Sequence, residues 1–201
     1  MATDRIAVYT AVYPGVERYL PRWHSSVLAQ TDTDFDLWIS VDSLEIDEVV
    51  GALGGETSAR FISERGATPA EIRHQAISKL VEHYSAVVFV DSDDLLYPTR
   101  VESARRELVS RELVGCALRI IDERETDLGI SFGPSGNDDL DTLLPRYNVF
   151  GLSNTAYRTE VLRDCLPIPS DCLCIDWLLA TRAWAMGAGL HFDHTPRMAY
   201  R

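Results

Sequence analysis

The stretch from residue 86 to residue 98 reads AVVFVDSDDLLYP, and the rest of the chain is best interpreted around it. Its first five residues are uniformly apolar, which is typical of a central parallel strand that is covered on both faces. Three aspartates follow this strand directly, namely Asp91, Asp93 and Asp94. Ligands of open α/β sheets bind beyond the carboxyl ends of the strands. We therefore predict that the functional site lies beside these carboxylates.

An Asp-x-Asp (DXD) pair at this position has two possible interpretations. If the backbone stays extended, Asp91 and Asp93 point to the same face, because side chains of a strand alternate. Two carboxylates on one face form half of an oxygen-ligand site for Mn²⁺ or Mg²⁺. A solvated turn in which an aspartate caps the next helix explains the same tetrapeptide equally well.

The segments before residue 86 alternate short apolar runs with helical patterns, which indicates a parallel α/β sheet. We expect strands at residues 5–10, 35–41, 61–62, 86–90 and 114–121, and helices at 17–28, 46–53, 68–84 and 98–110. Beyond these we expect strands at 126–132, 152–157 and, weakly, 197–200, a polar loop at 133–141 and a helix at 175–184. The predicted fold is one α/β domain over residues 1–201, with a mostly parallel, Rossmann-like sheet, helices on both faces and a less regular C-terminal third.

Composition limits the classes of ligand. The 201 residues carry 19 basic and 31 acidic side chains, a formal net charge of −12. Such a chain repels nucleic acids and anionic lipids, so a phosphorylated ligand needs a metal cation or a local arginine cluster. No apolar run approaches the roughly 18 residues of a membrane span, so we expect no transmembrane segment. The four cysteines fit neither a zinc site nor a disulfide framework, which predicts a cytoplasmic location.

One phosphatase class also places Asp-x-Asp after an apolar strand. Haloacid-dehalogenase-type phosphatases need Gly-Thr directly after the motif, where this chain has Asp94-Leu95, and a later basic residue, whereas the single lysine, Lys79, comes earlier. These differences argue against a covalent aspartyl-phosphate mechanism.

Five ordered elements span nearly the whole chain. They are Ser26–Gln30, Asp42 at the end of the second strand, Gly66 to Arg73-His74, Phe89–Pro98, and Ile175–Leu179 followed by Arg182 and Gly187. In this order they resemble the family 2 glycosyltransferases, whose fold is the GT-A nucleotide-sugar fold. The resemblance implies a metal-dependent, inverting, hexosyltransferase-like enzyme that moves a sugar from a nucleotide-sugar to an acceptor hydroxyl. It also implies a UDP-sugar as the donor, since UDP is the commonest donor nucleotide of that family.

The resemblance assigns roles residue by residue. The implied nucleotide-binding residues are Thr10, Ala11, Val12, Asp42, Arg73, Asp91 and Ser92. Asp91 and Asp93 would hold Mn²⁺ or Mg²⁺, which neutralises the leaving diphosphate. Asp176 would be the general base that removes the proton of the acceptor hydroxyl. Residues 1–110 would form a nucleotide-binding half, and residues 111–201 an acceptor-side half.

The acceptor side departs from the family pattern. Ile175 stands where the family has a glutamate before the base, and Arg201 stands where some relatives have a metal-binding histidine. Trp177, His194 and Arg201 are the candidates for contact with the acceptor. Each has a structural alternative: Asp176 at a helix start stabilises the helix dipole, and tryptophan at helical spacing usually packs in a core. A nucleotide-sugar binding protein without catalysis therefore remains the alternative function.

Overall fold

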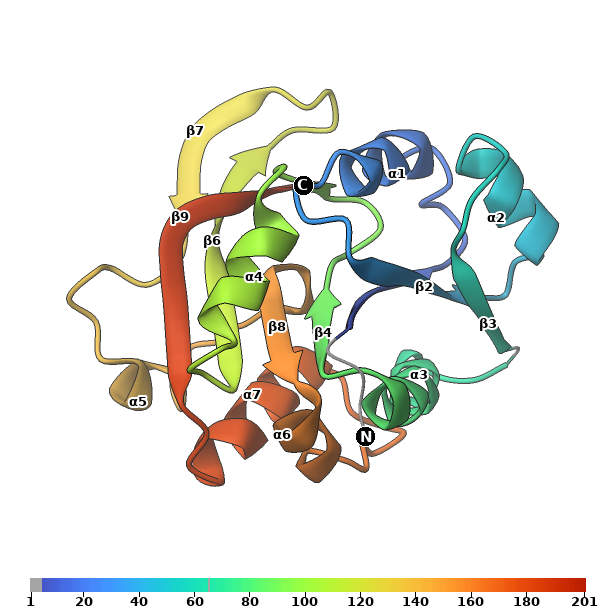
Figure 1. Cartoon of the computed structure of the whole chain (residues 1–201). Coiled ribbons are helices and arrows are strands. Elements are labelled where there is room, and N and C mark those ends of the chain that lie inside the picture. The colour runs from blue at the N-terminus through green and yellow to red at the C-terminus, as the bar shows by residue number, and fades with distance from the viewer. Residues whose placement is uncertain (1–4, 65) are drawn as a thin grey trace.

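The computed structural model describes residues 5–64 and 66–201 (Figure 1). The strands are β1 (Ile6–Val12), β2 (Phe35–Asp42), β3 (Arg60–Glu64), β4 (Ala86–Phe89), β5 (Leu95–Leu96), β6 (Leu113–Ile121), β7 (Asp127–Phe132), β8 (Thr155–Arg158) and β9 (Leu190–Tyr200). The helices are α1 (Leu20–Leu28), α2 (Ile46–Ala52), α3 (Pro69–His83), α4 (Arg100–Glu107), α5 (Leu140–Leu143), α6 (Thr159–Asp164) and α7 (Ile175–Ala185), with a 3₁₀ turn η1 (Leu152–Asn154).

Within the described residues the strands form one nine-stranded sheet. Its order is β3-β2-β1-β4-β8-β6-β9-β5, and β7 pairs with β6. The first four strands of this order are all parallel, so β2, β1 and β4 end at one edge, where Asp42, Val12 and Asp91 follow one another across the sheet. The other half is mixed, because β8 runs antiparallel to β4 and β6 while β9 runs parallel to β6. The predicted α/β fold with a Rossmann-like parallel sheet is confirmed.

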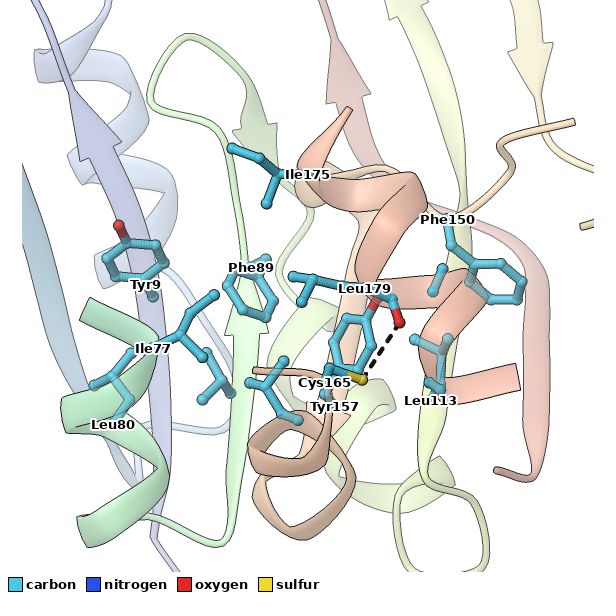
Figure 2. Close-up of a cluster of buried hydrophobic side chains, with 14 of the residues drawn as sticks. Tyr9, Ile77, Leu80, Phe89, Leu113, Phe150, Tyr157, Cys165, Ile175 and Leu179 are labelled. Atoms are coloured by element: carbon cyan, nitrogen blue, oxygen red, sulfur yellow. Dashed lines mark hydrogen bonds between the residues drawn. The ribbon is translucent and has the colours of Figure 1, made fainter. Parts of the chain in front are cut away.

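One face of the sheet is covered by α3, α6 and α7, which enclose an aromatic core (Figure 2). Tyr9, Phe89 and Tyr157 lie on the adjacent strands β1, β4 and β8, and neighbouring ring centroids are 5.8 and 5.7 Å apart, edge to face. Such pairs stabilise a core beyond the area that they bury. Ile77 of α3 and Leu179 of α7 pack against this row. The core therefore fixes both helices relative to the end of β4.

The opposite face is covered by α1, α2 and α4. Trp23 of α1, Val49 of α2 and Val101 of α4 are fully buried against apolar side chains of β1, β2 and β4. Strands buried on both faces carry apolar residues at successive positions, which is why the sequence of β1 and β4 lacks alternation. The predicted helices on both faces are confirmed.

The start of α3 follows from local sequence. The hydroxyl of Thr68 accepts a hydrogen bond from the amide of Glu71, whose carboxylate accepts one from the amide of Thr68, so the two form a capping box. Pro69 occupies the first turn, where no intrahelical donor is needed. This cap sets the position of Arg73 one turn later.

Several boundaries of the second half differ from the expectation. The weak strand expected at 197–200 is an eleven-residue strand, β9, because it pairs with β6 and β5 over most of its length. The segment 152–157 begins as the turn η1, since the amide of Asn154 donates to the carbonyl of Gly151, and only then becomes β8. The sequence pattern also missed β5 and α6, which are short; β5 pairs with β9, and α6 packs against α3, both far away in the sequence. None of the helices in the described ranges is long and apolar enough to cross a bilayer.

Candidate active site

The aspartates after β4 lie in a turn rather than in an extended segment. The amide of Asp94 donates to the carbonyl of Asp91 over 3.3 Å, which closes the turn. The extended backbone that would point Asp91 and Asp93 to the same face is therefore not present in this segment. The turn still keeps the two carboxylates close enough for Asp93 to raise the pKa of Asp91.

Asp94 connects this turn to the second half of the sheet. Its side chain is buried, and its two oxygens accept hydrogen bonds from the hydroxyl of Ser153 and, over 2.9 Å, from the amide of Arg201. Burial, together with repulsion from Asp91 and Asp93, raises the pKa of Asp94 to about 8, although these two hydrogen bonds lower it. Asp94 thus stabilises the position of the turn from within the protein.

Asp91 lies between two cavities and lines both. Burial, together with repulsion from Asp93 and Asp176, raises the pKa of Asp91 to about 6, although the guanidinium of Arg73 lowers it. Desolvated carboxylates in mutual repulsion are typical of functional sites. A cation placed beside Asp91 would relieve this repulsion.

The larger cavity, of about 590 Å³, lies between the start of α3 and the loop before α7. Arg73, Asp91 and Asp176 all line it. The guanidinium of Arg73 also donates to the carbonyl of Pro69 over 3.2 Å, which holds the guanidinium at the N-terminal end of α3. Of the sequence-predicted site residues, the structure brings these three together around one space.

The smaller cavity, of about 250 Å³, lies on the other side of Asp91 and Asp176. It is formed mainly by the second half of the sheet and by η1. Besides the two aspartates its described lining residues are Leu118, Ile120, Phe132, Asn148, Gly151, Leu152, Ser153, Asn154 and Tyr200.

Asp176 is the second residue of α7, and both of its carboxylate oxygens accept hydrogen bonds. Oδ1 accepts from the amide of Trp177 and Oδ2 accepts from the side-chain amide of Asn148, each over 2.8 Å. The first contact is the helix-start role that the sequence left open, and it coexists with exposure to both cavities. A carboxylate fixed in this way can accept a proton from a ligand without having to reorient.

The remaining nucleotide-binding candidates lie along the same edge of the sheet. The side chains of Thr10 and Val12 are buried, and the hydroxyl of Ser92 donates to the carbonyl of Ala11 over 2.9 Å. Asp42 is partly exposed and accepts from the hydroxyl of Ser43 over 2.8 Å. None of these five residues is among the described residues that line the two cavities.

The acceptor-side candidates have structural partners. The indole of Trp177 donates to the carbonyl of Leu144 over 2.9 Å, and His194 is exposed with its ring 5.6 Å from that of Phe192. Arg201 donates to the carbonyl of Asp93 and lies over the ring of Tyr19 at 4.7 Å. Thus Arg201 holds the aspartate turn, and neither Trp177 nor His194 is among the described residues around the two cavities.

Within the described residues no group of three or more His, Cys, Asp and Glu side chains is arranged to hold a metal ion. This is compatible with Mg²⁺ or Mn²⁺ chemistry, because Mg²⁺ is usually held by one or two carboxylates together with substrate phosphates. The repulsion around Asp91 fits such a shared site. Asp91 and Asp93 are the residues that would hold the ion.

Sequence reasoning missed Asn148 and Ser153, which hold Asp176 and Asp94. Both come from a segment without a clear pattern, and they lie 28 and 59 positions from their partners along the chain. No local signal in the sequence identifies these pairs.

The parallel half of the sheet ends in aspartates, and the second half of the chain brings Asp176 against them. The solved structures that match this chain identify the arrangement as the GT-A type of glycosyltransferase fold. No protein-family model matches the chain, and no curated protein matches it either. Solved structures do match. TarS of S. aureus, a glycosyltransferase, superposes with a TM-score of 0.72 at 16% identity, over 98% of this chain and 36% of that one.

Two complexes with ligands share the fold. TarS 1-349 with UDP-GlcNAc has a TM-score of 0.71 at 16% identity, over 97% of this chain and 58% of that chain. The mannosyltransferase PcManGT from Pyrobaculum calidifontis, with GDP-Man and Mn²⁺, has a TM-score of 0.68 at 15% identity, over 96% of this chain and 55% of that chain. This chain therefore spans less than two thirds of the length of these proteins. The likeness establishes the fold.

Proposed function

We propose that this protein is a metal-dependent glycosyltransferase that moves a sugar from a nucleotide-sugar to an acceptor hydroxyl. The observation that carries the proposal is that Asp91 and Asp176 line both cavities, while Arg73 lines the larger one. One guanidinium for a phosphate and two carboxylates for a metal and a proton are the groups that such a transfer needs. The structures of the same fold with UDP-GlcNAc and GDP-Man support a nucleotide-sugar donor.

The sugar and diphosphate of the donor are proposed to lie in the larger cavity, with the nucleoside along the neighbouring edge of the sheet. Arg73 would contact the diphosphate, while Asp42 and the backbone of residues 10–12, with Ser92, would contact the nucleoside from the edge of the sheet. Asp91 and Asp93 would hold Mn²⁺ or Mg²⁺, which supplies positive charge to the leaving diphosphate. The PcManGT complex with Mn²⁺ supports this choice of ion. The donor is proposed to be a UDP-sugar.

Asp176 is proposed to be the general base. A sugar hydroxyl is a weak nucleophile at neutral pH, so a fixed carboxylate within reach increases its rate of attack. Attack from the side opposite the leaving diphosphate inverts the anomeric centre. Residues 1–110 then act as the nucleotide half and residues 111–201 as the acceptor half, and the cytoplasmic location predicted from the sequence belongs to the same proposal.

Nucleotide and metal binding provide the direct test. We expect UDP or a UDP-sugar to raise the melting temperature only when Mn²⁺ or Mg²⁺ is present, because a ligand that binds the native state stabilises it by mass action. A thermal-shift panel of UDP, GDP, ADP and their sugar forms, with and without metal, measures this. The Asp93→Asn variant is the control and should lose the metal-dependent part of the shift. If no nucleotide changes the melting temperature with or without metal, the proposal is wrong.

Binding should also weaken in acid. The pKa of Asp91 is about 6, so below that pH its carboxylate is increasingly protonated and cannot hold a metal. We expect the metal-dependent affinity for a UDP-sugar to fall by up to about tenfold per pH unit below about pH 6. Calorimetric titrations between pH 5 and 8 measure this, and a UDP-sugar is the suitable probe because its esterified diphosphate does not titrate there. Affinity that stays constant across the range would contradict the role of Asp91.

A further inference from the structure

Two residues that line the smaller cavity each have a buried amide oxygen that lacks a partner. Within the described residues, Oδ1 of Asn148 and Oδ1 of Asn154 are both buried and make no hydrogen bond. Asn154 is wholly buried, and both residues line the cavity. A buried acceptor without a donor costs free energy, so these atoms point to a ligand that supplies donors.

The orientation of both amides follows from their other contacts. The nitrogen of Asn148 donates to the carboxylate of Asp176, and the nitrogen of Asn154 donates to the carbonyls of Cys116, over 2.8 Å, and Val149, over 3.2 Å. Carboxylates and carbonyls only accept hydrogen bonds, so neither amide can be turned around without losing them. The two oxygens are therefore the atoms left for a ligand.

The cavity selects against negative charge. Asp91 and Asp176 line it, and its described lining contains no arginine, lysine or histidine. Among the described lining residues a phosphate or carboxylate would meet two carboxylates and two carbonyl-type oxygens, and no cationic side chain. Uncharged hydroxyl groups can donate one hydrogen bond each to these four acceptors without the cost of bringing like charges together.

The rest of the lining is apolar. Leu118, Ile120 and Phe132 also line the cavity, and Phe132 is 42% exposed. A volume of about 250 Å³ is below the usual range for drug-sized ligands, about 300–1,000 Å³, and suits a single small ring. Hydroxyls on the edge of a ring and C–H groups on its face are the two surfaces of a sugar.

We propose that the smaller cavity is the acceptor site and that it binds an uncharged sugar ring. Its hydroxyls donate to Asn148 and Asn154, its face packs on Phe132, and the reacting hydroxyl donates to Asp176. This inference rests on the proposed function, since it takes the donor to occupy the larger cavity on the other side of Asp176. It names the class of acceptor, an uncharged glycoside or glycan, and the residues that select it.

The first test uses a matched pair on β7. Phe132→Ala removes the ring in the cavity, whereas Ile130→Ala removes a side chain of the same strand face that is 56% exposed and lies outside the described lining. We expect Phe132→Ala to raise the KM for an uncharged acceptor glycoside by roughly tenfold, the loss of one aromatic contact. Ile130→Ala should leave that KM unchanged, and neither variant should alter the affinity for the UDP-sugar. Equal effects of the two variants would overturn the proposal.

The second test adds a methyl group to the lining of the smaller cavity at Gly151. Gly151 has φ −72° and ψ 163°, which alanine adopts readily. A Cβ there would lie 3.4 Å from Oδ1 of Asn154 and 3.8 Å from Oδ2 of Asp176, in ordinary contact but in the space proposed for the hydroxyls. Gly151→Ala should therefore abolish acceptor binding and leave the affinity for the UDP-sugar intact, whereas Gly51→Ala in α2, where a Cβ meets nothing, should change neither. Weaker binding of the UDP-sugar relative to UDP would place the donor sugar in this cavity and overturn the proposal.

Direct binding separates this inference from the proposed function. Methyl glucoside, methyl glucuronide and glucose 6-phosphate are compared by saturation-transfer NMR with the wild-type protein and with Phe132→Ala. We expect binding of the uncharged glycoside alone, and its loss in the variant. Preference for an anionic sugar, or no binding of any, overturns the inference even if UDP binds. If no nucleotide binds, the proposed function fails, and this comparison still decides whether the cavity holds a sugar.

Discussion

Asp176→Asn is expected to lower the rate of sugar transfer by about 10²–10⁴-fold, the usual contribution of a positioned general base. The variant keeps the shape of the side chain but removes its ability to take a proton. The amide of Asn148 can turn to present its oxygen to the new side chain, so the contact between these two positions is retained. Nucleotide affinity should therefore stay within a factor of about two, since Arg73, Asp91 and Asp93 are untouched.

Single-turnover transfer and calorimetric nucleotide binding measure the two quantities. Asp171→Asn is the matched control, because Asp171 also lines the larger cavity but is exposed. Its transfer rate should remain near that of the wild type. Full activity of Asp176→Asn would contradict the assignment of the base. A wild type that binds UDP-sugars but shows no turnover with any donor and acceptor would instead favour the binding protein without catalysis.

Asp94→Asn is expected to stabilise the protein above neutral pH. The pKa of Asp94 is about 8 in the folded protein and near 3.8 in an unfolded chain. At a pH between these two values the carboxyl is protonated in the folded protein and ionised in the unfolded chain, so unfolding releases a proton. The free energy of unfolding should then fall as pH rises through this window, by at most about 1.4 kcal/mol per pH unit. Asparagine cannot ionise, so the variant does not lose this part of the free energy of unfolding as the pH rises.

The variant can also keep both hydrogen bonds of Asp94. Its oxygen can accept from the amide of Arg201, and its nitrogen can donate to the hydroxyl of Ser153. Urea titrations of both proteins from pH 6 to 9 give the measurement, with the difference between them isolating Asp94. We expect that difference to grow from pH 6 to pH 8 in favour of the variant. The control is Asp94→Ala, which loses both contacts and should be less stable than Asp94→Asn at every pH by about 1–3 kcal/mol.

Much of the nucleotide side followed from local patterns. The apolar run before Asp91 predicted a central strand, and the Thr68-Pro69 pair with Glu71 predicted the start of α3 and thus the place of Arg73. These features depend on neighbours within a few residues, where propensity, capping and burial pattern act directly. The α/β fold and the edge where the site lies could be predicted for that reason.

The environment of each carboxylate came only from the folded chain. Asp94 is buried where Ser153 of η1 and Arg201, which follows β9, reach it from distant parts of the chain. Asp176 is fixed by Asn148 from a segment without a pattern. The turn at Asp91–Asp94 likewise replaced the extended backbone, held by the Arg201 contact to Asp93. A short segment cannot encode such pairs, because each depends on two stretches that meet only when the sheet closes. Residue types and their order thus specified what chemistry is present, while long-range packing set which groups are desolvated, which are charged and which face one another.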